Sequence, residues 1–191
     1  MTLAQIMQLA LRQLDEAPED IGEYEDVFKS YANIGYDIAV REFLRPRERR
    51  TLFARRGGIP IGGMGISRVV ELWDARGRER AFELAPDGTH LRLTNPADEP
   101  KHEEYCALCE VSYPPLVEET DEPRLPPSAQ AALADYICYR HLSSGNLAKQ
   151  SRARFFEDSF YRAMRGIRPE GFGSVTRLRN LYEVTDARYR G

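Results

Sequence analysis

The 191-residue chain has few cysteines, no long apolar run and no surplus of positive charge. Its three cysteines, an odd number, argue against a secreted domain held together by disulfides. No apolar run approaches the roughly 18 residues of a membrane-spanning helix, and the N-terminus lacks the basic-then-apolar layout of a signal peptide. The formal net charge of -3 argues against non-specific nucleic-acid binding as the main activity, because such binding needs a basic surplus. We therefore expect a soluble protein in a reducing compartment, with no membrane association.

The motifs of common enzymes are also missing. There is no G-x-S-x-G, and the three histidines, His90, His102 and His141, have no recognisable nucleophile near them. Segment 57–65, GGIPIGGMG, is rich in glycine, but no Lys-Ser/Thr follows it and G-x-G-x-x-G does not fit it, which argues against a phosphate-binding loop. Paired carboxylates occur in polar connecting segments, where we expect solvated side chains. We therefore predict that the protein is not an enzyme and holds no cofactor.

One set of residues has the spacing of a metal site. Cys106-x-x-Cys109 and Cys138-x-x-His141 together form a C-x2-C…C-x2-H pattern, and zinc favours such ligands. However, the first pair lies in a strand-like segment, where residues three apart point to opposite faces, and no glycine provides the tight turn that usually surrounds zinc. Because cysteine is also among the residues most often simply buried, we predict core thiols and no bound metal.

Two stretches, 1–48 and 124–167, have the periodicity of an antiparallel helical bundle. Thr2 and Gln5 form a capping box before a short first helix that ends near Pro18. A second helix is predicted from Tyr24 to Leu44 and stops because the residue before Pro46 is forced out of the helical region. Its predicted core face consists of Val27, Phe28, Tyr31, Ile34, Gly35 and Ile38.

Segment 125–167 predicts a helical hairpin. Pro126 and Pro127 suit a first turn in which Ser128 can accept an amide hydrogen bond, and Gly145-Asn146 predicts a left-handed turn at the other end. The second helix carries an apolar stripe. We expect Phe155, Phe156 and Phe160 of this stripe to close the bundle against Leu133, Tyr136 and Ile137.

Between residues 49 and 123 the pattern changes to alternating β-formers separated by turn signals. Strands are predicted at 51–54, 66–73, 80–84, 90–94 and 105–113, in an antiparallel meander that forms a small sheet or a sandwich. An acidic, proline-rich connection follows. The predicted fold class is therefore α+β. An antiparallel bundle of about four helices (1–48 and 124–167) is interrupted by a small antiparallel β domain (49–123), and an extended C-terminal arm (168–191) follows.

Charges of the two signs are unevenly spread along the chain. Residues 98–122 are acidic, whereas 41–56 and 149–190 are rich in arginine, so the basic face of one copy can meet the acidic face of another. The arm mixes glycine breaks with arginines and aromatics, which suggests a segment that anchors on a partner. The candidate docking residues are Arg152, Arg154, Arg162, Arg165, Arg168, Phe172, Leu178, Leu181, Tyr182 and Tyr189. Further candidates are Ile59, Pro60, Ile61 and Met64, at the tip of a predicted protruding loop.

Three features of this layout resemble the head-to-tail connector, or adaptor, proteins of tailed bacteriophages, in the variant with a β domain inserted in the bundle. They are the segment YANIGYDIAVREFLRPRE, which ends in a Leu-Arg-Pro step, the passage SYPPLVEETDEPRLPPSAQAALADYICYR, and the final Phe-rich helix. The resemblance covers most of the chain in order.

This resemblance implies a structural virion protein, made in the host cytoplasm, that forms a ring of most often twelve copies between portal and tail. Genome DNA would pass through the ring without specific binding, and the last helix and the arm would contact the portal. Two alternatives stay open. One is a tail-side completion or terminator protein; the other is a small zinc- or nucleic-acid-binding protein.

Overall fold

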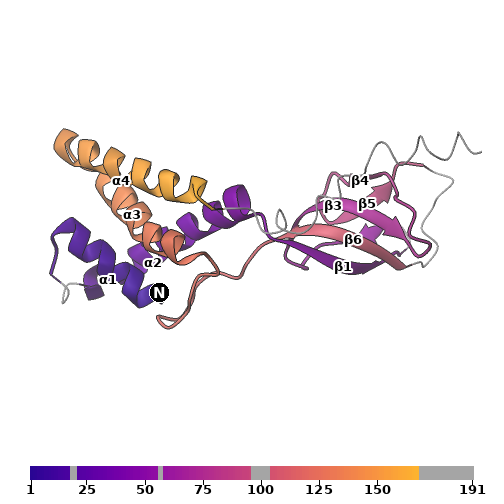
Figure 1. Cartoon of the computed structure of the whole chain (residues 1–191), viewed down its shortest axis with the longest axis horizontal. Helices are drawn as coiled ribbons and strands as arrows, with labels where there is room; N and C mark the ends of the chain where they lie inside the picture. The colour runs from indigo at the N-terminus through magenta and orange to yellow at the C-terminus, as the bar shows by residue number, and fades with distance from the viewer. Residues whose placement is uncertain (18–20, 56–57, 96–103, 168–191) are drawn as a thin grey trace, which may run out of the picture.

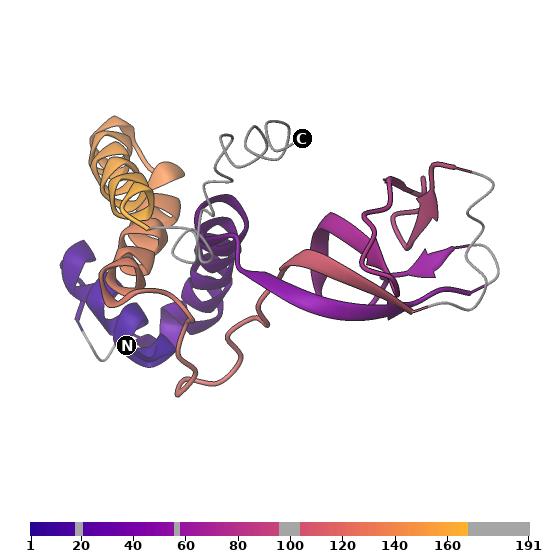
Figure 2. The ribbon, with the colours of Figure 1, turned by 45° about the vertical axis from the view of Figure 1, so that its right-hand side comes forward.

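The computed structural model describes residues 1–17, 21–55, 58–95 and 104–167. It contains a helical unit and a β unit, which lie end to end and are joined by two extended segments (Figures 1 and 2). The fold is therefore mixed α+β, as predicted. The predicted C-terminal arm, 168–191, lies outside the described residues.

The first helix, α1 (Leu3–Leu14), begins at the predicted capping box. Thr2 Oγ1 accepts a hydrogen bond from Gln5 N at 3.3 Å, and Gln5 Oε1 accepts one from Thr2 N at 3.0 Å. The helix ends at Asp15, which adopts the left-handed conformation. Its buried face is formed by Leu3, Ile6, Met7, Ala10, Leu11 and Leu14.

The second helix, α2 (Ile21–Ile38), continues into a π-helical segment, η2 (Ala39–Leu44). It ends at Arg45, with φ of 45°, immediately before Pro46, as predicted. The predicted core face of this helix is partly wrong, because Val27 and Ile34 are 44% and 40% exposed. The helix is rotated so that a narrower stripe faces inward. That stripe consists of Phe28, Ala32, Gly35 and Tyr36.

Gly35 explains this rotation. A Cβ atom at position 35 would lie 2.9 Å from the ring of Tyr136, so only glycine lets that ring lie against the helix backbone. The close approach of α2 to the ring turns Val27 and Ile34 toward solvent.

Helices α3 (Pro127–Ser143) and α4 (Leu147–Arg165) form the predicted hairpin. Pro127 lies in the first turn of α3, but no side chain caps that end, so the predicted cap by Ser128 is wrong. The predicted left-handed turn is also wrong, since Gly145 has no positive φ. Asn146 instead begins α4, and its side chain accepts a hydrogen bond from Lys149 N at 3.0 Å.

Helix α3 is the centre of the bundle, because α1, α2 and α4 all pack on it. Phe160 and Phe156 of α4 are buried, and the Phe160 ring lies 4.9 Å from that of Tyr136. Phe155 is 69% exposed, so its predicted place in the core is wrong. The reason is the helical period of about 3.6 residues, which puts Phe155 roughly 100° away from Phe156.

The proline-rich connection packs on the bundle rather than on the β unit to which we assigned it. Asn33 on α2 donates to the carbonyl of Leu116 at 2.9 Å and accepts from its amide at 2.7 Å. Leu3 N also donates to the carbonyl of Asp121 at 2.8 Å. Leu116 and Leu125 consequently belong to the helical core.

The β unit consists of two three-stranded sheets. The first has the order β1 (Arg47–Phe53), β6 (Glu104–Val111), β3 (Ile66–Asp74), and the second has the order β2 (Ile59–Pro60), β5 (His90–Leu93), β4 (Phe82–Leu84). All pairings are antiparallel. The predicted simple meander is wrong, because the last strand inserts between the first and the third.

The two sheets continue into each other at both edges. A bridge between Arg55 and Gly58 joins β1 to β2, and a bridge between Trp73 and Glu79 leads from β3 toward β4. The sheets therefore enclose one barrel-like core. It consists of Leu52, Ala54, Ile59, Ile61, Val69, Leu72, Leu91, Tyr105, Ala107, Cys109 and Val111.

Tyr113 connects the two cores, since it packs against both of them. The guanidinium of Arg124 lies 5.3 Å from the centroid of the Tyr113 ring, and Arg124 N donates to Tyr36 Oη at 3.1 Å. The chain enters the β unit through β1 and leaves it through the neighbouring β6. This adjacency allows the β unit to be inserted while the helical segments on either side still meet.

Asp74 at the end of β3 organises the corner that leads to β4. It is the one buried charged side chain in the described part of the protein. Its carboxylate accepts hydrogen bonds from the backbone amides of Arg76 and Arg78, both at 2.9 Å, and from the guanidinium of Arg80 at 2.8 Å. These bonds, the Arg78 amide foremost, lower the pKa of Asp74 to about 2.

We expect Asp74→Asn to lower the melting temperature at pH 7, because an amide cannot accept all of these bonds. A carboxyl with a lowered pKa stabilises the folded state above its unfolded pKa of about 3.8, and that contribution is lost as the pH falls through about 2. The difference in melting temperature between the two proteins should therefore shrink between pH 4 and pH 2. Thermal melts followed by circular dichroism measure this difference in melting temperature. The control is Glu83→Gln, the same kind of substitution at an exposed side chain. Equal melting temperatures at pH 7 would contradict this role.

Candidate interaction surfaces

The outward side of α4 exposes two large apolar side chains. Leu147 is 81% exposed and Phe155 69% exposed, and their separation of eight residues corresponds to about 12 Å along the helix. On the opposite side of the helix, Phe156 and Phe160 face the core. Burying Leu147 and Phe155 against a partner would remove apolar area from water, so this side of α4 is a candidate protein-binding surface.

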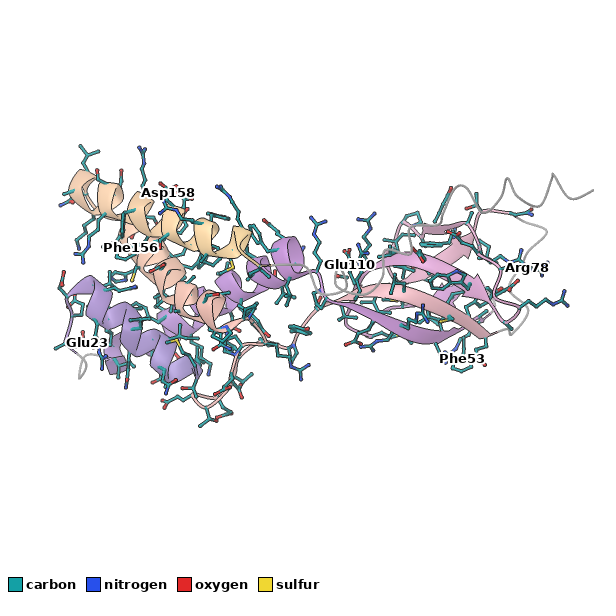
Figure 3. All side chains as sticks on the ribbon, in the orientation of Figure 1. Glu23, Phe53, Arg78, Glu110, Phe156 and Asp158 are labelled. Atoms are coloured by element: carbon teal, nitrogen blue, oxygen red, sulfur yellow. The ribbon has the colours of Figure 1, made fainter. Side chains whose placement is uncertain are left out.

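Arginines surround these two side chains. Arg154, Arg162 and Arg165 are exposed, and none of them forms an ion pair with any residue that the structure describes. Figure 3 shows Asp158, the acidic residue on this side, pointing away from the bundle. We call Leu147, Arg154, Phe155, Asp158, Arg162 and Arg165 the basic face of α4. At about 100° per residue they occupy an arc of about 100° around the helix.

Arg152, another of the predicted docking residues, has an internal role. Its guanidinium donates to the carbonyl oxygen of Gln13 and, at 2.8 Å, to the carboxylate of Asp15. It also lies 5.9 Å from the centroid of the Phe156 ring. Arg152 therefore ties α4 to the C-terminal end of α1. The other docking candidates, Arg168, Phe172, Leu178, Leu181, Tyr182 and Tyr189, lie outside the described residues.

A second exposed surface lies on α2. Val27 and Ile34, which the sequence had suggested as core residues, are flanked by the exposed acids Glu23, Asp26 and Asp37. The carboxylate of Asp37 accepts from Arg41 at 3.0 Å, whereas Glu23 and Asp26 have no ion-pair partner in the described ranges. We call Glu23, Asp26, Val27, Ile34, Asp37 and Arg41 the acidic face of α2. Its signal in the sequence is the recurrence of acids at positions 23, 26 and 37 on the same side as Val27 and Ile34.

The glycine-rich segment does not form the protruding apolar tip that we predicted. Ile59 is fully buried and Ile61 nearly so, while Pro60 is half-buried in β2, opposite His90 of β5. The segment folds back at Gly58, which brings both isoleucines into the β core. Of the four predicted loop residues, Met64 alone is exposed.

The residues of the possible zinc pattern do not come together. Cys109 is buried in the β core and Cys138 in the helical core, as predicted. The predicted core position of Cys106 is wrong, because alternation along β6 turns its side chain outward. The Cys138 thiol donates to Gln13 Oε1 at 3.2 Å, and burial raises its pKa to about 12, which keeps it protonated. His141 lies against the rings of Tyr24 and Phe28, and burial lowers its pKa. Within the described ranges, no group of three or more histidine, cysteine or acidic side chains is placed to hold a metal ion.

A surface cavity of about 460 Å³ lies on the β unit. Its described lining includes Arg49, Trp73, Asp74, Glu104 and Cys106. The carboxylate of Asp74 is already engaged by the arginines of the corner, and no histidine is among the described lining residues. The cavity therefore has no nucleophile paired with a base among the residues that the structure describes.

No helix in the described part of the chain is both long and apolar enough to cross a membrane. Neither the models of known protein families nor the curated protein sequences yield a match to this chain.

Proposed function

We propose that the protein is a structural component of a tailed bacteriophage, a connector (adaptor) that forms a ring between portal and tail and through which genome DNA passes. The proposal starts from the resemblance of the segments around Arg45-Pro46 and 112–140 to that family. The order of the elements supports it: two helices, an inserted β unit and a helical hairpin. We propose a non-catalytic role in virion assembly, at the neck of the virion.

The observation that carries the proposal is the basic face of α4. Two large apolar side chains and three arginines without ion pairs in the described structure form a surface suited to binding another protein. This surface lies on the helix that, by the resemblance, contacts the portal. The partners would be further copies of the chain, most often twelve in all, the portal protein, and a tail or tail-completion protein.

The test is to mix the full-length protein with the portal and to examine the mixture by cosedimentation and electron microscopy. We expect a ring of density on the tail-facing side of the portal, and loss of cosedimentation for the double variant Leu147→Ser, Phe155→Ser. The matched control is Val117→Ser, which removes an exposed apolar side chain elsewhere. Binding to the tail tube but not to the portal would favour a tail-side completion protein instead.

Binding of duplex DNA by the isolated protein provides a second test. A ring through which the genome moves must not grip it, because each arginine that neutralises a phosphate adds affinity. The isolated protein should bind DNA no more tightly than the non-specific range of about 10⁻⁴–10⁻⁶ M at physiological salt. Nanomolar, sequence-dependent binding would refute the connector proposal and favour a nucleic-acid-binding protein.

A further inference from the structure

The basic face of α4 and the acidic face of α2 are complementary in charge. Three arginines and one aspartate lie on the first, whereas three acids and one arginine lie on the second. Each face also carries two exposed apolar side chains about two helical turns apart, Leu147 and Phe155 on α4, and Val27 and Ile34 on α2. The two faces therefore have opposite net charge and a similar spacing of exposed apolar side chains.

The two faces cannot meet within one chain. Both helices pack on α3, and their exposed faces point away from it. Figure 1 shows α4 along one side of α3 and α2 on the other side. In Figure 3, Asp158 and Glu23 point away from opposite sides of the bundle. A contact between the faces must therefore join two molecules.

We propose that copies of this chain associate head to tail, with the basic face of α4 of one copy packed against the acidic face of α2 of the next. Such a contact uses different surfaces on the two copies, so it repeats from copy to copy and closes into a ring when the rotation allows. The inference rests on the proposed ring and deepens it by naming the surfaces that would build it. It assigns the basic face of α4 to the next copy, so the portal would contact other surfaces of the assembled ring.

The positions of the charges favour antiparallel helices. If Phe155 lies against Val27 and Leu147 against Ile34, then Arg154 and Arg162 flank the acids at the start of α2. The parallel arrangement would instead bring Asp158 close to Asp37, and Arg165 close to the arginines at the end of η2. The antiparallel arrangement has one unfavourable pair of its own, since Asp158 then lies at the level of Glu23. Arg154 and Arg162 on either side of Asp158 offset this repulsion, so the antiparallel arrangement, which has fewer like-charge contacts, is the favoured one.

Charge reversal tests these surfaces. One variant carries Arg154→Glu and Arg162→Glu, and the other carries Glu23→Arg and Asp26→Arg. We expect each variant alone to need at least about a tenfold higher concentration than the original chain for half of the molecules to associate, as measured by sedimentation velocity. All four residues are exposed, so thermal melts should show that both variants remain folded.

Mutual rescue is the decisive outcome. In an equimolar mixture of the two variants, copies can alternate, because every α4 then meets an α2 of opposite charge. We expect the mixture, and the chain that carries all four substitutions, to associate as the original chain does. Oligomers that neither reversal weakens would overturn the inference but leave the connector proposal standing. A chain that stays monomeric up to its solubility limit would also overturn the inference.

Disulfide trapping tests the arrangement of the helices. The exposed Cys106 is first replaced by serine, and Phe155→Cys is then combined with Val27→Cys. Under mild oxidation we expect a ladder of covalent oligomers from this pair. We expect little from Phe155→Cys with Ile34→Cys, whose crosslinking would indicate parallel helices.

A chain ending at Ile167 should associate as the full-length chain does. If this shortened chain no longer associates, residues 168–191 rather than α4 bind the acidic face of α2, and the inference is overturned. Cosedimentation with the portal tests the connector role separately.

Discussion

Replacing Phe160 by alanine is expected to lower the free energy of unfolding by about 3–5 kcal/mol, the usual range for removing a large side chain from a core. The side chain is fully buried in the helical unit. Its ring lies 4.9 Å from that of Tyr136 on α3 and 5.2 Å from that of Tyr161. The substitution leaves a cavity between α3 and α4 that these rings cannot fill without moving.

The matched control is Phe155→Ala, the same substitution on the same helix. Phe155 is 69% exposed, so we expect its loss to change the free energy of unfolding by less than about 0.5 kcal/mol. Urea unfolding followed by far-ultraviolet circular dichroism measures both values, and an unchanged slope shows that the midpoints can be compared. A loss of under about 1 kcal/mol for Phe160→Ala would show that this side of α4 is not part of the core.

The helix ends were predictable because their signals are local. The capping box at Thr2 and Gln5 and the stop before Pro46 each depend on residues a few positions apart. The turn between α3 and α4 was predicted at the right place with the wrong conformation. There Asn146 caps the following helix instead of ending the preceding one.

The core faces were less predictable where apolar residues lie on both sides of a helix. On α2, Val27 precedes Phe28, and on α4, Phe155 precedes Phe156, so the pattern alone allows either residue to face inward. The Tyr136 ring against Gly35 decides the rotation of α2, and that contact joins residues about a hundred positions apart. The acidic face of α2 was missed for the same reason.

Strand order and the role of Arg152 depend on contacts distant in sequence. No local signal places β6 between β1 and β3, or brings Arg152 to Asp15. The burial of Ile59 and Ile61 did have a signal, since apolar residues two positions apart are typical of a half-buried strand. The neighbouring glycines led us to expect a protruding loop instead.

Replacing Gly58 by alanine should destabilise the β unit strongly. Gly58 has φ of 144° and forms the bridge with Arg55 where β1 turns into β2. A Cβ atom there would lie 2.5 Å from the carbonyl oxygen of Leu91 and 2.8 Å from the ring of His90. The backbone strain costs about 1–3 kcal/mol and the overpacking about 1–3 kcal/mol. We therefore expect Gly58→Ala to lower the free energy of unfolding by about 2–6 kcal/mol.

Gly88→Ala separates these two causes, because Gly88 has φ of 69° but a Cβ atom added there would meet nothing within 4 Å. We expect Gly88→Ala to lower the free energy of unfolding only by the cost of the left-handed backbone, about 1–2 kcal/mol. Trp73, the single tryptophan, lies in β3 and reports unfolding of the β unit by fluorescence, while circular dichroism follows the helices. If the closed corner at Gly58 holds the two sheets together, Gly58→Ala should destabilise the unfolding transition reported by Trp73 fluorescence much more than Gly88→Ala does. Equal shifts for the two variants would mean that strand β5 can move away from the corner, and that the β unit does not depend on this closure.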